Sequence, residues 1–321
     1  MKKRIVMLLC LGLCLSLVGC KKSENPKTDF QYEISKDGTS VYINKYIGTS
    51  KNVVIPSKID DLPVTSIKGI VDETGYVQEG AFEGCDIQSV TIPEGVTGIG
   101  LYAFKDCKDL TQVAIPESLE ILTYGAFCNC ERLKSIDLSA TKLTALLELT
   151  FYDCVSLKKI ALPSGITSIG AKAFYNCSSL LEIHLPEELV RMDDAAFSGC
   201  TALKTVTVNT KADLLSLSAS AFSNVPALEK IIFEEGREQI NGYAFFDTTS
   251  SIEIVIPKSV KKFSPEPFFL RGPAKITFLG DCPEIVGKSE FYGEPTIIYD
   301  PDTSGWDTCI WKDRYTLTPK K

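Results

Sequence analysis

A repeat solenoid built around a parallel β-sheet is the fold class that the sequence predicts, and three recurring features predict it. Phenylalanine recurs every 22 to 25 residues from Phe82 to Phe291. A stretch that alternates apolar and polar residues and ends at proline recurs with it, as in Leu180-x-x-Ile183-x-Leu185-Pro186. Cysteine follows the phenylalanine by three residues in six copies. A period of this length is typical of a solenoid in which each repeat forms one coil.

The N-terminus has the pattern of an export signal. A basic start precedes an apolar run over residues 5–18, which is too short to span a membrane. The run ends in Leu17-Val18-Gly19-Cys20, which resembles the lipobox of bacterial lipoproteins, although a generic signal peptide is the alternative. We expect a signal peptide over residues 1–19, then a lipidated Cys20 and a polar tether over residues 20–29. The lipid would hold the mature protein on the extracellular face of the cell membrane.

Residues 30–52 are expected to cap the first coil. Tyr32-Glu33-Ile34 and Val41-Tyr42-Ile43 alternate apolar and polar residues around a turn at Lys36-Asp37-Gly38-Thr39. A terminal coil cannot leave its apolar side bare, so a capping β-hairpin is predicted here. The solenoid itself is placed over residues 53–300, with about ten repeats of about 23 residues each.

Two segments depart from the regular repeat. Residues 68–79 form an insertion, and insertions in a solenoid leave as loops from one face. The array is expected to close at Ile297-Ile298-Tyr299-Asp300-Pro301. Residues 301–321, which contain Trp306 and Trp311, are then predicted to form a C-terminal cap.

Several units carry a resemblance to a known family, namely Val90-Thr91-Ile92-Pro93, Val96-Thr97-Gly98-Ile99-Gly100, Ala103-Phe104-Lys105-Asp106-Cys107 and their copies. They resemble the BspA-like leucine-rich repeats of bacterial surface proteins, over roughly residues 32–299. The resemblance implies a leucine-rich-repeat horseshoe with a parallel β-sheet on its concave face and irregular or short helical return segments. It also implies a secreted or surface-anchored protein, and some members of the family bind host matrix proteins or other cells. It carries over no catalytic residue.

The cysteines are spaced by about one coil, which favours a buried ladder of reduced thiols. Adjacent rungs lie near disulfide distance, but their parallel Cβ vectors suit the bond poorly. Pairs with the C-x-x-C spacing of zinc sites are absent from the sequence. Without Cys20, the mature chain keeps an odd number of cysteines, so at least one is unpaired within the chain. For Cys282 and Cys309, the sequence leaves two alternatives open, namely a disulfide in the cap or two free thiols.

Composition and motifs argue against several function classes. The net charge is −7 and no basic cluster follows the N-terminus, which disfavours a nucleic-acid partner. The single histidine, His184, lies between Ile183 and Leu185, so it should point outward without the partners of a metal or catalytic site. Phosphate-binding loops and nucleophile elbows do not occur in the sequence. We therefore expect no catalysis, no metal and no cofactor.

The outward side chains of the parallel strands form the remaining candidate site. In each strand the residues flanking an apolar core position should face solvent and should line up from coil to coil. The candidates for binding on this face are Gln112, Asp137, Lys159, Glu182, His184, Thr205, Thr207, Lys230, Ile232 and Glu253.

These features predict a lipid-anchored cell-surface protein that binds a macromolecule, either a protein or a glycan, through its solenoid surface. A rigid array of coils would hold many weak contacts in fixed geometry. The alternative is a surface module that captures carbohydrate or peptide for delivery to a transporter or an enzyme. Aromatic residues in the outward columns would favour carbohydrate, and those columns contain none.

Overall fold

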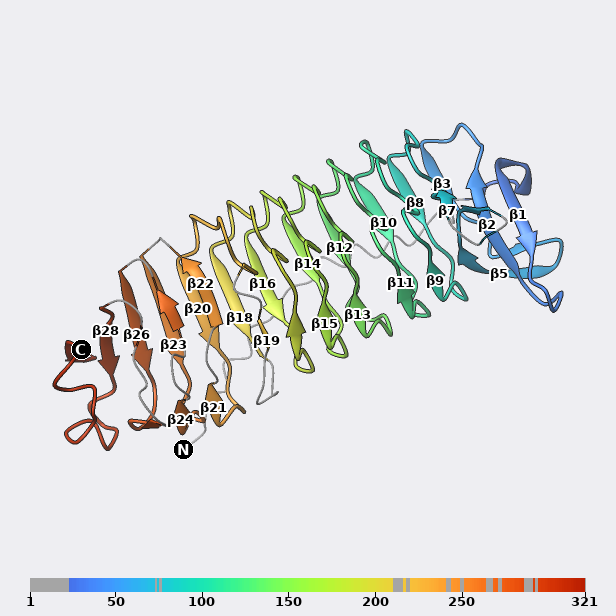
Figure 1. Ribbon diagram of the computed structural model, residues 1–321. Helices are drawn as coiled ribbons and strands as arrows, with labels where there is room; N and C mark the ends of the chain where they lie inside the picture. The colour runs from blue at the N-terminus through green and yellow to red at the C-terminus, as the bar shows by residue number, and fades with distance from the viewer. Residues whose placement is uncertain are drawn as a thin grey trace, which may run out of the picture.

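The computed structural model describes residues 23–72, 74, 77–209, 216–217, 220–240, 244–248, 251–263, 268–270, 273–285, 291 and 294–320. The described coils stack into an elongated array, with the first coils at one end and the C-terminus at the other (Figure 1). Among the described residues the single helical segment is η1 (Lys27–Asp29), a short 3₁₀ turn. The predicted repeat solenoid with parallel sheets is therefore confirmed, and its return segments are turns and very short strands rather than helices.

The longest feature is a column of parallel strands, one from each coil, which we call the front sheet. Neighbouring strands pair in register or lie in direct contact along the whole column. Its strands are β3 (Asn52–Val54), β8 (Ser89–Thr91), β10 (Gln112–Ala114), β12 (Ser135–Asp137), β14 (Lys159–Ala161), β16 (Glu182–Leu185), β18 (Thr205–Val208), β20 (Lys230–Phe233), β23 (Ile252–Ile256), β26 (Ala274–Phe278), β28 (Thr296–Tyr299) and β29 (Leu317–Pro319).

A second column of shorter parallel strands forms the next side of each coil. Most of these strands have only two residues, because one apolar residue such as Ile169 or Met192 is enough to fill the core at this corner. They are β5 (Leu62–Ile67), β9 (Gly98–Ile99), β11 (Ile121–Leu122), β13 (Ala145–Leu146), β15 (Ser168–Ile169), β17 (Arg191–Met192), β19 (Ser216–Leu217), β21 (Gln239–Ile240), β24 (Lys262–Phe263) and β27 (Glu284–Ile285). In two later coils a third side is also extended, as β22 (Ala244–Thr248) and β25 (Phe268–Leu270).

The N-terminal end is closed by antiparallel strands. Strands β1 (Phe30–Ile34) and β2 (Val41–Tyr46) form a hairpin, and β2 also pairs in parallel with β5. Strand β4 (Lys58–Ile59) pairs with β5, and the insertion forms the small hairpin of β6 (Ile70–Val71) and β7 (Val77–Glu79). The polar stretch before the hairpin is also docked, because Asn25 exchanges hydrogen bonds with the backbone of Val54 at 2.8 Å. Asn25 is thus held against the first coil.

The C-terminal cap contributes one more strand to the front sheet. Strand β29 pairs with β28 in parallel register, beyond the point where the repeat signature ends at residue 301. The loop between these strands buries Trp306 and Trp311 against the last coils, with Trp306 stacked on Tyr299 at 5.0 Å between ring centroids. Trp311 packs edge-on against Phe263 at 5.8 Å. The apolar end of the array is thereby covered.

A column of stacked phenylalanine rings runs through the core. The rings from Phe82 to Phe222 are fully or almost fully buried, and neighbouring centroids lie 4.8–5.6 Å apart with nearly parallel planes. The stack exists because phenylalanine occupies the same position in every one of these coils. Offset aromatic pairs of this kind contribute beyond the area that they bury.

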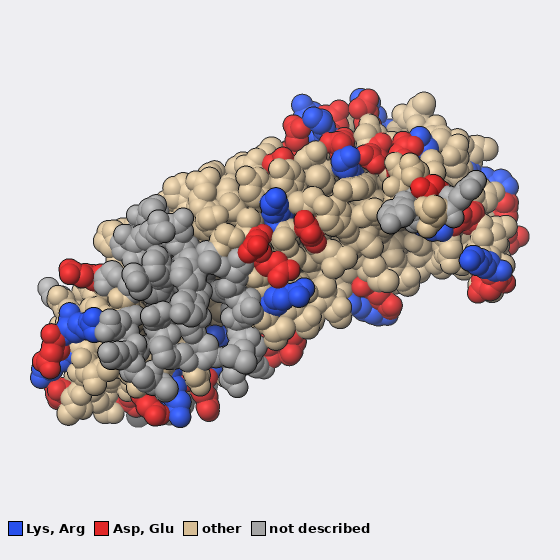
Figure 2. Space-filling view, viewed as in Figure 1, with Lys and Arg blue, Asp and Glu red and all other residues tan. Residues whose placement is uncertain are grey.

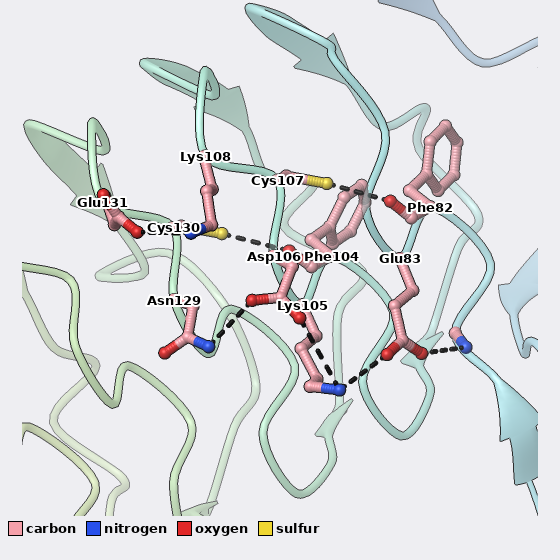
Figure 3. A network of polar contacts seen from close by, with 11 residues as sticks. Phe82, Glu83, Phe104, Lys105, Asp106, Cys107, Lys108, Asn129, Cys130 and Glu131 are labelled. Carbon is pink, nitrogen blue, oxygen red and sulfur yellow. Dashed lines mark hydrogen bonds and ion pairs between the residues drawn. The ribbon is translucent and has the colours of Figure 1, made fainter.

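The cysteine ladder ties each coil to the one before it. The Cys107 thiol donates to the carbonyl oxygen of Phe82 at 2.9 Å, and Cys130 makes the same bond to Phe104 at 3.1 Å (Figure 3). Cys154, Cys177 and Cys200 repeat the bond. Each of these thiols thus fills a small buried slot and also satisfies a buried carbonyl group. The prediction of a ladder of buried thiols agrees with this geometry.

Candidate functional site

The front sheet presents two columns of outward side chains in register. One column includes Glu182, Thr205, Lys230 and Glu253, and the other includes His184 and its neighbours in the following coils. Among the ten residues predicted for this face, five are exposed, namely Gln112, Asp137, Lys159, Glu182 and His184. Thr205, Lys230, Ile232 and Glu253 are half-buried, while Thr207 is only 5% exposed. The available surface therefore changes from open and polar to recessed along the array.

His184 projects into solvent from β16, beside Thr207 of the next strand. Across the described residues, no group of three or more histidine, cysteine, aspartate or glutamate side chains is arranged to hold a metal ion. His184 is consequently one polar position of the front face.

A groove of about 410 Å³ lies where the front sheet becomes recessed, near its C-terminal end. Its walls come from β20, β23, β26, β28 and β29, so only the last coils and the cap build it. The lining residues are Lys230, Glu253, Val255, Lys275, Thr277, Leu279, Ile298, Thr318, Pro319 and Lys320. The groove thus combines an aliphatic floor with a largely basic rim.

Glu253 is the single acidic residue of the groove and organises its polar side. Its carboxylate lies 3.4 Å from the Lys230 ammonium and 3.3 Å from the Lys275 ammonium, and it accepts a hydrogen bond from Thr277 at 3.2 Å. Burial favours a raised pKa for Glu253, but the hydrogen bond from Lys275 and the charge of Lys230 outweigh burial and hold the pKa below its usual value. Glu253 is therefore ionised at neutral pH and keeps both lysines over the groove.

Sequence reasoning found only part of this groove. Lys230 and Glu253 were among the predicted binding residues, and Lys275 follows them in register on the next strand. The opposite wall depends on Thr318 and Pro319 of β29, which carries no repeat signature. The predicted residues from Gln112 to Thr207 lie on the same face, in earlier coils outside the groove.

A larger cavity of about 540 Å³ lies at the N-terminal cap, beside the β1–β2 turn. Two of its charged residues already pair with each other, because Lys68 forms an ion pair with Glu33 at 2.6 Å, and Lys68 also lies over the ring of Tyr42. Asp37 accepts hydrogen bonds from Ser35 and Thr39 within the turn itself. This cavity is better explained as the hollow behind a capping hairpin, and the C-terminal groove remains the stronger candidate.

The described surface in view carries acidic and basic side chains side by side, without an extended basic region (Figure 2). Tyrosines such as Tyr152 and Tyr175, whose rings stack at 5.1 Å, follow the core phenylalanines and do not line the groove. In the part of the chain that the structure describes, no helix is long and apolar enough to cross a membrane. The signal peptide and Cys20, predicted from the N-terminal sequence, lie outside the described residues.

Comparison with solved structures finds repeat proteins from bacteria. A leucine-rich repeat protein of T. pallidum is 24% identical, with a TM-score of 0.45 over 71% of this chain and 86% of that one. A leucine-rich repeat protein of Bacteroides ovatus is 19% identical, with a TM-score of 0.49 over 91% and 98% of the two chains. A leucine rich cell surface protein of Faecalibacterium prausnitzii is 20% identical, with a TM-score of 0.48 over 94% and 96%. No curated protein matches the chain.

The family itself is shown by the repeats. A family model described as the BspA type leucine rich repeat region matches in six copies, over residues 75–172 and 144–271. The matched residues make up more than half of the chain, and they coincide with the coils that carry the phenylalanine stack and the cysteine ladder. This chain therefore belongs to the BspA-type leucine-rich repeat family.

Proposed function

We propose that this protein is a lipid-anchored cell-surface protein that binds an extended acidic segment of another protein in the groove at the C-terminal end of the front sheet. The groove itself is the observation that carries the proposal. It is the place where the outward columns become concave and partly apolar, and such sites are where ligands are usually bound. The family supports a role at the bacterial surface.

Charge complementarity favours an acidic partner. Three lysines, Lys230, Lys275 and Lys320, line the groove, whereas Glu253 is its single carboxylate. The whole chain, by contrast, has a net charge of −7. The groove is thus a local basic site on an acidic protein. Carboxylates of a partner would approach the lysines, while aliphatic side chains beside them would cover Val255 and Ile298.

The solenoid supports such binding through its rigidity. Most of the residues that line the groove lie on strands that pair in register from β20 to β29, and Leu279 and Lys320 directly follow two of these strands. Little backbone freedom is lost when a ligand is bound to a preformed sheet, which leaves more of the contact energy as affinity.

A peptide-binding assay tests the proposed ligand class. The probe is a short peptide that alternates glutamate with leucine, and its control replaces glutamate with glutamine. We expect the mature protein to bind the acidic peptide at low salt, to bind it less at high salt, and to bind the amide control weakly. Equal binding of the two peptides, or binding of glycans alone in a parallel screen, would contradict the proposal and favour carbohydrate capture.

Matched variants test the location. Lys320→Glu and Val255→Asp should each reduce affinity about tenfold, because one reverses a rim charge and the other places a charge on the apolar floor. Lys159→Glu is the control, since Lys159 occupies the same outward column as Lys230 but lies several coils away. A loss with Lys159→Glu as large as with Lys320→Glu would place binding outside the groove.

Anchoring is tested separately at Cys20. We expect the protein to incorporate a labelled fatty acid and to fractionate with the membrane, and Cys20→Ser to abolish both. Membrane retention of Cys20→Ser without label would indicate another means of attachment.

A further inference from the structure

Two cysteines meet where the cap joins the last coils. Cys282 lies just after β26 and Cys309 lies in the cap loop, and their sulfur atoms are 2.7 Å apart. The backbones around them are already fastened, because the Cys282 amide donates to the Ser304 carbonyl and the Ser304 amide donates to the Asp281 side chain, both at 2.9 Å. The two sulfurs could therefore be bonded with little movement of the chain.

The other cysteines are arranged differently. The five ladder thiols each donate to a carbonyl oxygen of the preceding coil, and burial raises their pKa well above the usual value; they are Cys107, Cys130, Cys154, Cys177 and Cys200. Such thiols are poor nucleophiles. Within the described residues, the pair in the cap is the one place where one cysteine sulfur is hydrogen-bonded to another.

The electrostatics of the pair favour reaction. The hydrogen bond from the Cys282 thiol lowers the pKa of Cys309 to about 7, against the opposing effect of burial. The same hydrogen bond raises the pKa of Cys282. Cys309 is therefore partly a thiolate at neutral pH, which is the nucleophilic form in disulfide exchange.

We propose that Cys282 and Cys309 form a disulfide bond after export and that this bond locks the C-terminal cap onto the solenoid. The oxidant is a thiol–disulfide exchange partner, either a small disulfide or a protein disulfide. One cap thiolate attacks a sulfur of the oxidant and forms a mixed disulfide. The S–S bond of the oxidant breaks, and its other sulfur leaves as a thiolate, which takes up a proton. The second cap thiolate then attacks the mixed disulfide, forms the Cys282–Cys309 bond and releases the other thiol. The pair loses two protons and two electrons, and the oxidant gains them.

The bond would fix the part of the cap that completes the groove. It joins the segment after β26 to the loop that precedes β29, and β29 supplies Thr318 and Pro319 to the groove wall. A link between residues 282 and 309 also restricts the unfolded cap, which stabilises the folded state.

Thiol counting on the full mature chain tests the proposal, with Cys20 replaced by serine to keep the protein soluble. The protein is treated with oxidised glutathione, denatured, alkylated and weighed. We expect seven of the nine remaining cysteines to be alkylated, and a non-reducing digest to yield one cross-linked peptide pair containing Cys282 and Cys309. Alkylation of all nine after oxidation, or a cross-link that involves the ladder cysteines instead, would overturn the proposal.

A second measurement follows the cap itself. Trp306 and Trp311 are both buried in it, so their fluorescence reports its unfolding. The thermal midpoint of this signal should rise by at least about 5 °C on oxidation. The Cys282→Ser, Cys309→Ser variant should show no shift on oxidation, and Cys128→Ser, which alters a cysteine outside the pair, should shift as the parent does. No shift in the parent, although the bond is present, would refute the locking role.

Discussion

The phenylalanine stack makes the interior of the array sensitive to a single substitution, and Phe151→Ala is the sharpest test. Phe151 is completely buried, and its ring lies 5.6 Å from Phe127 and 5.4 Å from Phe174. Truncation of a buried phenylalanine costs about 3–5 kcal/mol through lost transfer energy and the cavity left behind. Phe151→Leu keeps much of the volume but loses both ring contacts, so we expect a smaller cost of roughly 1–3 kcal/mol.

The assay is guanidinium unfolding followed in parallel by far-UV circular dichroism and by tryptophan fluorescence. Circular dichroism reports all coils, whereas both tryptophans lie in the cap. A break at Phe151 separates the array into two stacks that contact each other weakly, since each coil is stabilised mainly by its neighbours. The dichroism transition should therefore begin at lower denaturant, ahead of the fluorescence transition.

Leu181→Ala is the matched control, because Leu181 belongs to a neighbouring coil and its side chain is 48% exposed. It should change the free energy of unfolding by no more than about 0.5 kcal/mol. If Phe151→Ala cost less than about 1 kcal/mol, or no more than Leu181→Ala, the stacked core would not be the main source of stability.

Three further outcomes are expected. Gly170→Ala should destabilise by about 1–3 kcal/mol in the same denaturation assay, because a Cβ atom there would lie 2.6 Å from the backbone nitrogen of Glu148. Asn129→Asp should lose about 1 kcal/mol at neutral pH and recover at low pH, since the Asn129 amide donates to Asp106 at 2.8 Å, a carboxylate in its place would repel Asp106, and protonation of the new carboxyl group restores a donor. Iodoacetamide at pH 8 should leave Cys154 unlabelled in the native protein, because burial raises the pKa of its thiol, and should label it after denaturation; rapid native labelling would contradict the ladder.

The coil interior was predictable because the same apolar positions recur in every regular repeat. Alternation placed Phe174, Ile183 and Leu185 inside, and all three are at most 1% exposed. The repeat also contains a signal for a turn. Two residues after the phenylalanine, Asp106 and Asn129 adopt positive φ, as do their equivalents in later coils. Aspartate, asparagine and glycine at that position indicate a left-handed turn before each cysteine.

The groove could not be predicted from the repeats, for a physical reason. A repeat pattern tells which side chains face outward, but a hollow depends on side-chain sizes in several coils at once. Its far wall comes from β29, where Leu317-Thr318-Pro319 pairs with β28 only because the cap loop folds back over Trp306. The pairing of β29 thus depends on tertiary contacts of the cap. The sequence shows only a short apolar stretch near the end of the chain.

The docked N-terminal stretch bears on the distance between a lipid on Cys20 and the groove. Because Asn25 is already bound to Val54, a lipid on Cys20 would leave only a few residues between the membrane and the first coil. Each coil adds about 4.8 Å, so the eight steps from β3 to β23 place the groove about 40 Å from the anchored end. With such an anchor, the regular middle coils would act as a spacer between the lipid and a partner bound in the groove.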